Sequence, residues 1–313
     1  MRRRSLVALA LASVAALAAM PLALAQAVPS ARPARVGAVR AVTPRAVTPR
    51  AAARPAARAR RPQPRDLSGG QLIEGHCPPG VARCLAFTFD DGPEHATTPR
   101  LLDLLDAHRV KATFFVVGHR LDGEHHALHR AALRETARRG HLIGTHSYHH
   151  VLLDGLRPEA LAYELDRTAE LVRQVTRQRP VLFRAPFGAL AGRRSVEAVA
   201  ARRWTPAYWM IDTHDWEVTS AQAVVDRFRQ ELAEHPRGGV VLMHDTRPWS
   251  VSAFPLIMGV VERRNRELTA RGEAPYRIVN LDAFVRPRGS APLRGEPNAE
   301  RRLRRAREAA AAR

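Results

Sequence analysis

Cysteine and lysine are the scarcest reactive residues of this 313-residue chain, which has two cysteines and a single lysine, Lys111. Cys77 and Cys84 are too far apart for a Cys-x-x-Cys pair, and no second pair exists, which argues against a cysteine-based metal or redox site. In an oxidising compartment the two thiols would close a small loop. We predict a disulfide, contributing about 2–3 kcal/mol in the chain-entropy model, with two free thiols as the alternative.

Acidic residues are missing from one end of the chain and sparse at the other. Residues 1–65 contain thirteen arginines and no acid, and residues 286–313 contain nine arginines against three glutamates, so the part between them is nearly neutral. A nucleic-acid-binding fold would carry its basic face on the folded part itself, so we predict no nucleic-acid partner. Anionic envelope polymers are the partners that basic tails would attract.

The sequence of the N-terminus predicts export, and the segments on either side of the central part are expected to form little packed structure. Three arginines precede an uncharged stretch and a small-x-small cleavage pattern, which is typical of a signal peptide over residues 1–27. Pro21 argues against a membrane-spanning helix, although an uncleaved N-terminal anchor remains the alternative. We predict a disordered Ala/Arg/Pro-rich tether over 28–66, one folded domain over 67–285, a basic tail over 286–313, and a periplasmic or extracellular location.

A glycine-rich phosphate loop is also missing after the first predicted strand, which argues against a nucleotide-binding fold. Apolar runs and amphipathic stretches alternate between the two tails. The predicted strands are 84–89, 112–117, 141–144, 181–184, 205–211, 239–243 and 276–279, and the predicted helices are 98–108, 124–139, 158–178, 195–202, 221–234 and 255–270. This alternation predicts an α/β fold with about seven parallel strands, either closed as a barrel or open and doubly wound.

Polar side chains collect where these strands end. Asp90 and Asp91 end the first strand, and three histidines, His146, His149 and His150, follow the third. Further polar residues follow the later strands: Arg184, Asp212, Asp215, Trp216, His244 and Asp245. Because active sites of parallel α/β folds assemble at the carboxyl ends of strands, this regularity predicts an enzyme.

Two imidazoles and one carboxylate form a hydrolytic zinc site when a coordination position stays open. His146 and His150 are four residues apart, and Asp91 is the candidate third ligand. His149 is the rival second ligand, since a three-residue spacing can also converge.

The chain resembles the polysaccharide deacetylases of the NodB-homology type (carbohydrate esterase family 4) over roughly residues 84–285. Five motifs follow the family's order: Thr-Phe-Asp-Asp-Gly at 88–92, His-Ser-Tyr-His-His at 146–150, Arg-Ala-Pro-Phe at 184–187, Asp-Thr-His-Asp-Trp at 212–216 and Leu-Met-His at 242–244. The resemblance implies a distorted (β/α) barrel of about seven parallel strands and a hydrolase that removes N-acetyl groups from a cell-envelope or chitin-like polysaccharide.

The same resemblance implies a role for each motif residue around the metal. Asp91, His146 and His150 would hold one divalent ion, most simply Zn²⁺. Asp90 would be the general base toward the attacking water, kept ionised by the neighbouring cation of Arg184.

The remaining motif residues would act on the oxyanion and the leaving group. His244 would protonate the leaving amine, with Asp215 holding its ring and raising its pKa. A backbone N–H near Phe187 would help to stabilise the oxyanion, and Trp216 would form an apolar wall. Phe187 stands where the family more often has Tyr, and Val151 where Pro is common.

Other conspicuous residues are given structural interpretations. His125, His126 and His129 occupy a helical stretch and are expected to face solvent rather than to form a second metal site. Trp249, after His244, is equally a sugar platform or a packing residue.

Two alternative functions remain open. The same site would also suit an amidase or deformylase acting on a small amide. A non-catalytic glycan-binding envelope protein is the other alternative. The sequence leaves the oligomeric state, the glycan and the acetyl position unspecified.

Overall fold

A sheet of eight parallel strands forms the centre of the computed structural model, which describes residues 66–72 and 77–286. The predicted signal peptide, nearly all of the tether and nearly all of the C-terminal tail lie outside the described residues. The strand order is β6-β5-β4-β3-β2-β8-β7, with β9 paired to the first half of β2. The strands are β2 (Arg83–Asp90), β3 (Thr113–Val116), β4 (Leu142–Thr145), β5 (Leu182–Phe183), β6 (Thr205–Pro206), β7 (Ile211–Asp212), β8 (Gly238–His244) and β9 (Tyr276–Ile278).

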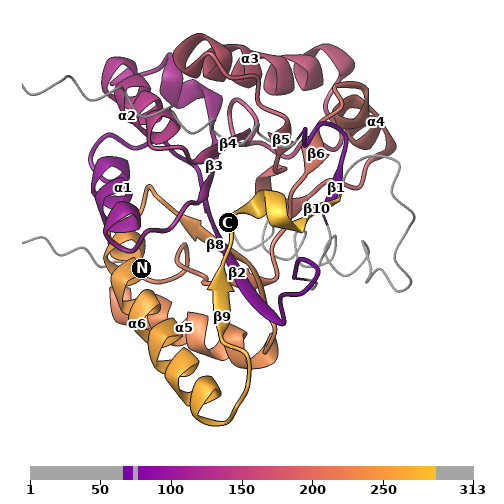
Figure 1. Cartoon of the computed structure of the whole chain (residues 1–313). Coiled ribbons are helices and arrows are strands. Elements are labelled where there is room, and N and C mark those ends of the chain that lie inside the picture. Colours follow the sequence, from indigo (N-terminus) through magenta and orange to yellow (C-terminus); the bar gives the residue numbers. More distant parts are fainter. Residues whose placement is uncertain (1–65, 73–76, 287–313) are drawn as a thin grey trace, which may run out of the picture. The chain divides into compact units, whose positions relative to one another are not determined.

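Within the described residues, six α-helices surround this curled sheet, and Figure 1 shows their arrangement. They are α1 (Thr98–Ala107), α2 (His126–Arg138), α3 (Pro158–Thr176), α4 (Arg193–Ala201), α5 (Ala221–Glu234) and α6 (Pro248–Ala270). Prolines occupy the first turns of α1, α3 and α6. The N–H groups of a first turn have no acceptor within the helix, so the N–H that proline lacks costs no intrahelical hydrogen bond there. The predicted distorted barrel of parallel strands is confirmed. No helix within the described ranges combines the length and the apolarity that crossing a membrane requires.

The predicted strand 205–211 is wrong as a single element. It is two short strands, β6 and β7, which pair with β5 and β8 at the two edges of the sheet. The linker between them crosses the gap, since the N–H of Ala207 donates to Phe183 O and the N–H of Met210 donates to Val240 O. Thr205 and Ala207 both donate to β5, so the missing N–H of Pro206 falls on the opposite edge of β6, where a further strand would need a donor, and a linker closes the barrel there instead.

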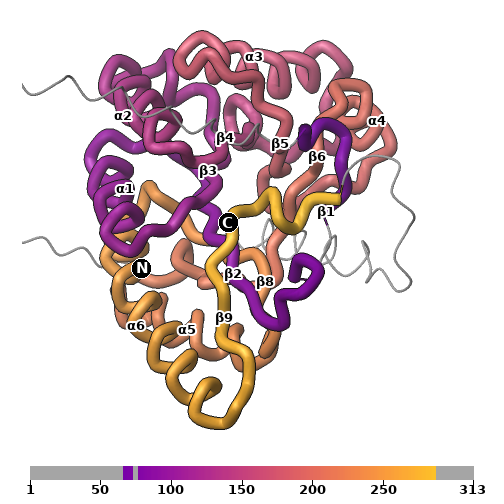
Figure 2. Tube along the Cα trace, in the orientation of Figure 1, coloured from indigo at the N-terminus to yellow at the C-terminus, as the bar shows by residue number. Residues whose placement is uncertain are grey.

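Two other elements differ from the prediction. Helix α6 begins at Pro248 rather than at residue 255, and Pro255 lies inside it. Pro248 fills the first helical position, so the later proline did not mark the start. A short antiparallel pair, β1 (Gln71–Leu72) with β10 (Val285–Arg286), was not predicted, and it brings the two ends of the described chain side by side (Figure 2).

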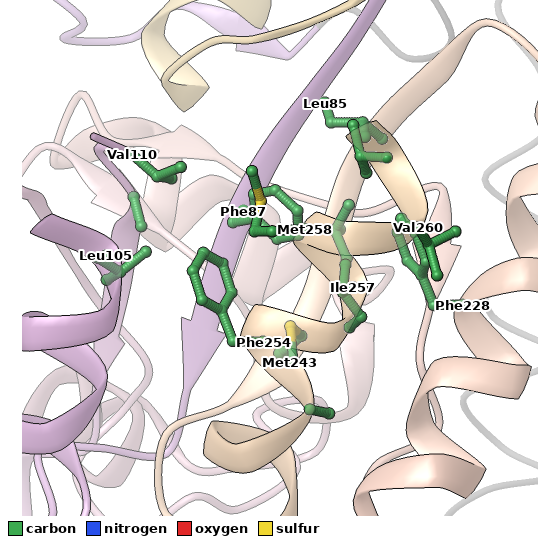
Figure 3. Packing of buried hydrophobic residues seen from close by; sticks show 14 of the residues in the cluster. Leu85, Phe87, Leu105, Val110, Phe228, Met243, Phe254, Ile257, Met258 and Val260 are labelled. Atoms are coloured by element: carbon green, nitrogen blue, oxygen red, sulfur yellow. The ribbon is translucent and has the colours of Figure 1, made fainter. Parts of the chain in front are cut away.

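The main hydrophobic core lies between the sheet and helices α1, α5 and α6. Figure 3 shows Phe254, Ile257 and Met258 of α6 packed around Phe87 of β2. The Phe87 and Phe254 rings meet edge to face with centroids 5.3 Å apart. Fully burying a side chain of this size stabilises the fold by about 1.5–3 kcal/mol.

Alternation along β2 decides which of its side chains reach the barrel interior. Phe87 and Phe89 belong to the main core. Because side chains alternate along a strand, Thr88 and Asp90 face the other way, toward Arg184. The N-terminal end of β2 is joined to the preceding segment by the Cys77–Cys84 disulfide, which confirms that prediction.

Candidate active site

Asp90 and Arg184 form a buried ion pair at the carboxyl end of β2. Arg184 Nη1 donates to Asp90 Oδ1 at 2.8 Å and to Thr88 Oγ1 at 2.8 Å, and neither charged side chain is more than 3% exposed. Arg184 Nε and Nη2 donate to Ala207 O and Tyr208 O of the linker that closes the barrel. Burial raises the pKa of Asp90 above its ordinary value, against the opposing charge of Arg184.

Asp91, His146 and His150 come together beside this pair. Asp91 Oδ1 lies 3.3 Å from His150 Nε2 and 3.7 Å from His146 Nε2, and ligand atoms of all three lie within 4.8 Å of one another. His149, the rival ligand, lies elsewhere, since its Nδ1 is 2.6 Å from Glu164 Oε1. The structure therefore groups His146 and His150, rather than His149, with Asp91.

The electrostatics of this cluster suit a divalent cation. Burial lowers the pKa of His146 to about 4, so its ring is neutral, and its Nδ1–H donates to Arg184 O at 2.7 Å, which leaves the Nε2 lone pair facing Asp91. Desolvation raises the pKa of Asp91, but His244, His150 and His146 lower it to about 2. Its buried Oδ1 accepts no hydrogen bond from the described residues. A carboxylate oxygen without a donor, facing imidazole nitrogens, fits a metal ligand.

Left-handed backbone conformations concentrate in the same motifs. A non-glycine residue with positive φ costs about 1–3 kcal/mol and persists where the surroundings impose it, often at functional sites. Five such residues lie in the predicted motif segments: Asp91, Ser147, His150, Phe187 and His214. At His150 this conformation goes with a hydrogen bond from its N–H to Ser147 Oγ at 3.0 Å, which helps to fix the loop after β4.

His244 and Asp215 form the second charged pair of the site. Asp215 accepts twice from His244, with Oδ1 2.6 Å from the ring Nδ1 and Oδ2 2.7 Å from the backbone N. Burial lowers the pKa of His244, but the charge and hydrogen bond of Asp215 outweigh it and raise the pKa to about 10. His244 Nε2 lies 4.0 Å from Asp91 Oδ2, so the pair borders the metal-type cluster.

The aromatic residues divide into packing and rim positions. Phe187 is half-buried, and its ring meets that of His150 with centroids 4.7 Å apart. Trp249 Nε1 donates to Asp215 O at 2.7 Å, so this residue helps to fix the backbone of Asp215, which in turn binds His244. Trp216 is half-buried on the loop after β7, with its ring 5.8 Å from that of His214.

Asp245 is an additional buried acid, for which the sequence offered no role. It is fully buried, accepts from Thr98 Oγ1, and its desolvation raises its pKa to about 7. Gly92 lies directly against its carboxylate, where any Cβ would overlap it. The only sequence signal for this contact is the Gly-Pro step after Asp91, which permits so close an approach of the backbone.

The expectation that His129 faces solvent is wrong. His125 and His126 are exposed as expected, but His129 is only 5% exposed. It lies on the inner side of the first turn of α2, against residues 94 and 95. In the sequence, the four-residue spacing of His125 and His129 indicates only that both lie on the same side of a helix. It does not show which of the two is buried.

Comparison with known proteins gives one consistent result. The family described as "Polysaccharide deacetylase" matches residues 79–203. The chain is 35% identical over 167 residues to a chitooligosaccharide deacetylase of Rhizobium leguminosarum bv. trifolii, covering 53% of this chain and 73% of the relative. It is 30% identical over 199 residues to the peptidoglycan-N-acetylmuramic acid deacetylase PdaC of Bacillus subtilis, covering 64% of this chain but only 38% of PdaC. The first curated relatives are thus spanned over less than two thirds of their length.

A solved structure agrees with this result. The structure described as "T48 deacetylase with substrate" is 30% identical, has a TM-score of 0.54, and is matched over 66% of this chain and 94% of its own. The family match ends at residue 203, so the His244–Asp215 pair lies beyond it.

Proposed function

This chain belongs to the polysaccharide deacetylase family, and from that membership we propose that it hydrolyses N-acetyl groups of a polysaccharide with the help of one divalent cation. In reaction terms it would be a hydrolase of carbon–nitrogen bonds other than peptide bonds. One observation carries the proposal. A metal-type cluster, Asp91 with His146 and His150, lies between a buried carboxylate, Asp90, and a histidine held by an acid, His244.

Asp91, His146 and His150 would hold the cation, and two imidazoles with one carboxylate suit Zn²⁺ better than Mg²⁺ or Ca²⁺. Such a cation supplies Lewis acidity, which makes water more acidic and polarises the acetamide carbonyl. The protein's own side chains would supply the general base and the general acid.

Asp90 is proposed as the general base. Arg184 occupies its Oδ1, while Oδ2 lies 3.6 Å from His146 Nε2 and therefore faces the cluster. The second oxygen is thus directed to the place where a water would be activated. A raised pKa suits this role, because a stronger base takes a proton more readily as long as Arg184 keeps it ionised.

His244 is proposed as the general acid. With a pKa raised to about 10 in this structure, the ring is protonated at neutral pH, and Asp215 fixes Nδ1 so that Nε2 points toward Asp91. The Nε2 proton is then available to the leaving amine. Phe187 and Trp216 are the candidates for the oxyanion contact and the apolar wall.

The substrate and the location are inferred more coarsely. Relatives named for peptidoglycan and for chitooligosaccharides support an N-acetylated glycan of the cell envelope or of chitin-like composition. A disulfide persists in oxidising compartments, so Cys77–Cys84 supports the export that residues 1–27 predict. The basic tails, outside the described residues, would add attraction to anionic envelope polymers.

Acetate release from defined glycans tests this function. The Asp90→Asn variant should lose acetate release while it keeps its zinc, because Asp90 is not among the three proposed ligands. Asp226→Asn, a matched change on the exposed surface of α5, should leave the rate unchanged. Undiminished acetate release by Asp90→Asn would reject the base. Release from small amides but from no glycan would favour the amidase alternative, and glycan binding without any release would favour a binding protein.

A further inference from the structure

A second group of histidine and carboxylate side chains lies where the segment that follows Asp91 meets helix α2. It consists of Glu94 and His95, just before α1, and His129 in the first turn of α2. His95 Nδ1 lies 2.8 Å from Glu94 Oε1 and 3.1 Å from His129 Nε2, and His129 Nε2 lies 3.5 Å from Glu94 Oε1. Bonds of about 2.0–2.1 Å to a tetrahedral zinc ion place neighbouring ligand atoms about 3.3 Å apart. The three measured separations bracket that value.

The surroundings of His129 match those of His146 in the active site. His129 Nδ1–H donates to Arg120 O at 2.9 Å, just as His146 Nδ1–H donates to Arg184 O. A carbonyl on the outer nitrogen fixes the tautomer of a metal-binding histidine and leaves the inner nitrogen as a lone pair. The His129 side chain is 6% exposed, so its Nε2 faces His95 and Glu94 rather than water.

The carboxylate is arranged in the same sense. Arg120 Nη1 donates to Glu94 Oε2 at 2.8 Å, which leaves Oε1 directed at the two histidines. Although desolvation raises the pKa of Glu94, Arg120 and the backbone N–H of Ala96 bring it below its ordinary value, so the carboxylate is ionised.

Donors are few where the three ligand atoms face one another. If His129 Nδ1 carries the ring proton, its Nε2 is an acceptor, and Glu94 Oε1, which the backbone N–H of Ala96 reaches at 3.5 Å, is an acceptor as well. A neutral His95 brings at most one proton to Nδ1, which either acceptor can take. A cation in the middle would instead be ligated by all three, with His95 in its other tautomer.

We propose that Glu94, His95 and His129 bind a second divalent cation of the Zn²⁺ class. Two imidazoles and one carboxylate select a borderline cation such as Zn²⁺ rather than Mg²⁺ or Ca²⁺. His125, whose exposed ring lies with its centroid 5.0 Å from that of His95, is the side chain placed to become a fourth ligand.

This second site would have a positioning role. It joins the segment that carries Asp91 to α2, because Glu94 follows Asp91 by three residues whereas His129 belongs to the helix. The Arg120 charge lowers the pKa of both Asp91 and Glu94, so the two sites already share one electrostatic neighbour. Binding at the second site would restrain the loop that presents Asp91 to the first.

Metal stoichiometry of the full chain tests the proposal without relying on activity. After equilibration with Zn²⁺ and dialysis, elemental analysis should give two equivalents for the wild type. His95→Ala and His129→Gln should each give one equivalent, and so should Asp91→Asn/His150→Ala, which removes the active-site ligands. His126→Ala, an exposed histidine on the same turn of α2, is the matched control and should keep both.

A second readout covers variants that fold poorly. In the Asp91→Asn/His150→Ala background, added Zn²⁺ should raise Tm, and adding His95→Ala should abolish that rise, because only binding to the folded state stabilises it. His95 is partly exposed, so its removal leaves no large cavity. One equivalent in the wild type that Asp91→Asn/His150→Ala removes would overturn the second site and leave the proposed function standing. Loss of zinc only with His95→Ala would support the second site and reject the proposed catalytic one.

Discussion

Arg184 donates to Asp90 across the barrel interior at 2.8 Å, and both side chains are shielded from water. The guanidinium also stacks on the ring of Phe115, with its carbon 4.2 Å from the centroid, and its other N–H groups hold the linker that closes the barrel. One side chain therefore serves the proposed base and the closure of the sheet together.

Replacing Arg184 should accordingly damage stability as well as activity. Arg184→Gln leaves the Asp90 carboxylate buried without its partner, and breaking a buried pair in this way lowers the free energy of unfolding by about 3–5 kcal/mol. Urea unfolding followed by circular dichroism measures the loss. The control is Arg202→Gln, which breaks the exposed pair with Asp166 and should cost less than about 1 kcal/mol. Equal effects of the two changes would contradict the importance of burial.

The neighbouring residues His149 and His150 should behave oppositely toward zinc. His150 shares the cluster with Asp91, whereas His149 pairs with Glu164 at 2.6 Å. We expect His150→Ala to lose the active-site equivalent of zinc, with acetate release reduced by at least a hundredfold. His149→Ala should keep that equivalent. Elemental analysis of both variants, beside an acetate assay, decides the matter. Retention of that equivalent by His150→Ala would reject His150 as a ligand.

Much of this site was predictable because the sequence shows where each parallel strand ends. Apolar runs that end in Asp90, His146, Arg184 and His244 predict strands, and parallel strands bring their carboxyl ends to one edge. The motif order added the family. These predictions depend on local sequence pattern and on one general rule, that the carboxyl ends of parallel strands meet at one edge of the sheet.

The remainder depends on tertiary contacts that local pattern does not contain. His149 and His150 have equally suitable spacings, and the loop conformation, with positive φ at His150, separates them. The break between β6 and β7 follows from where the sheet edges lie. His129 appears polar and helical in sequence, yet the segment around His95 covers it.

Gly92 should tolerate no side chain, since a Cβ at this position would overlap the Asp245 carboxylate. Gly92→Ala forces the loop away from β8, and overpacking of this kind costs about 1–3 kcal/mol. Because Asp91 is the adjacent residue, zinc at the active site should weaken as well. Gly259→Ala in α6 is the matched control, since its Cβ meets nothing within 4 Å and a helical alanine is favoured by up to about 1 kcal/mol. Urea unfolding and zinc competition with a chelator measure both effects.

The His244–Asp215 pair predicts how the stability of the metal-free protein depends on pH. Desolvation disfavours the charged ring, but Asp215 raises the folded-state pKa of His244 to about 10, above the unfolded value near 6.5. A raised pKa means that the folded state holds the proton more tightly. The stabilisation is therefore complete below about pH 6.5 and is lost as the pH rises toward 10.

Asp215→Asn removes the charge that raises this pKa. In chelator-treated protein, the wild type should lose stability between pH 6.5 and 10, and the variant should lose less over the same interval because its His244 is already neutral there. Urea unfolding at half-unit steps of pH measures both slopes, and Asp282→Asn, a change on a carboxylate outside the site, serves as the control with the wild-type slope. Parallel curves for wild type and Asp215→Asn would mean that Asp215 does not set the protonation of His244, and the assignment of His244 as the acid would lose its electrostatic basis.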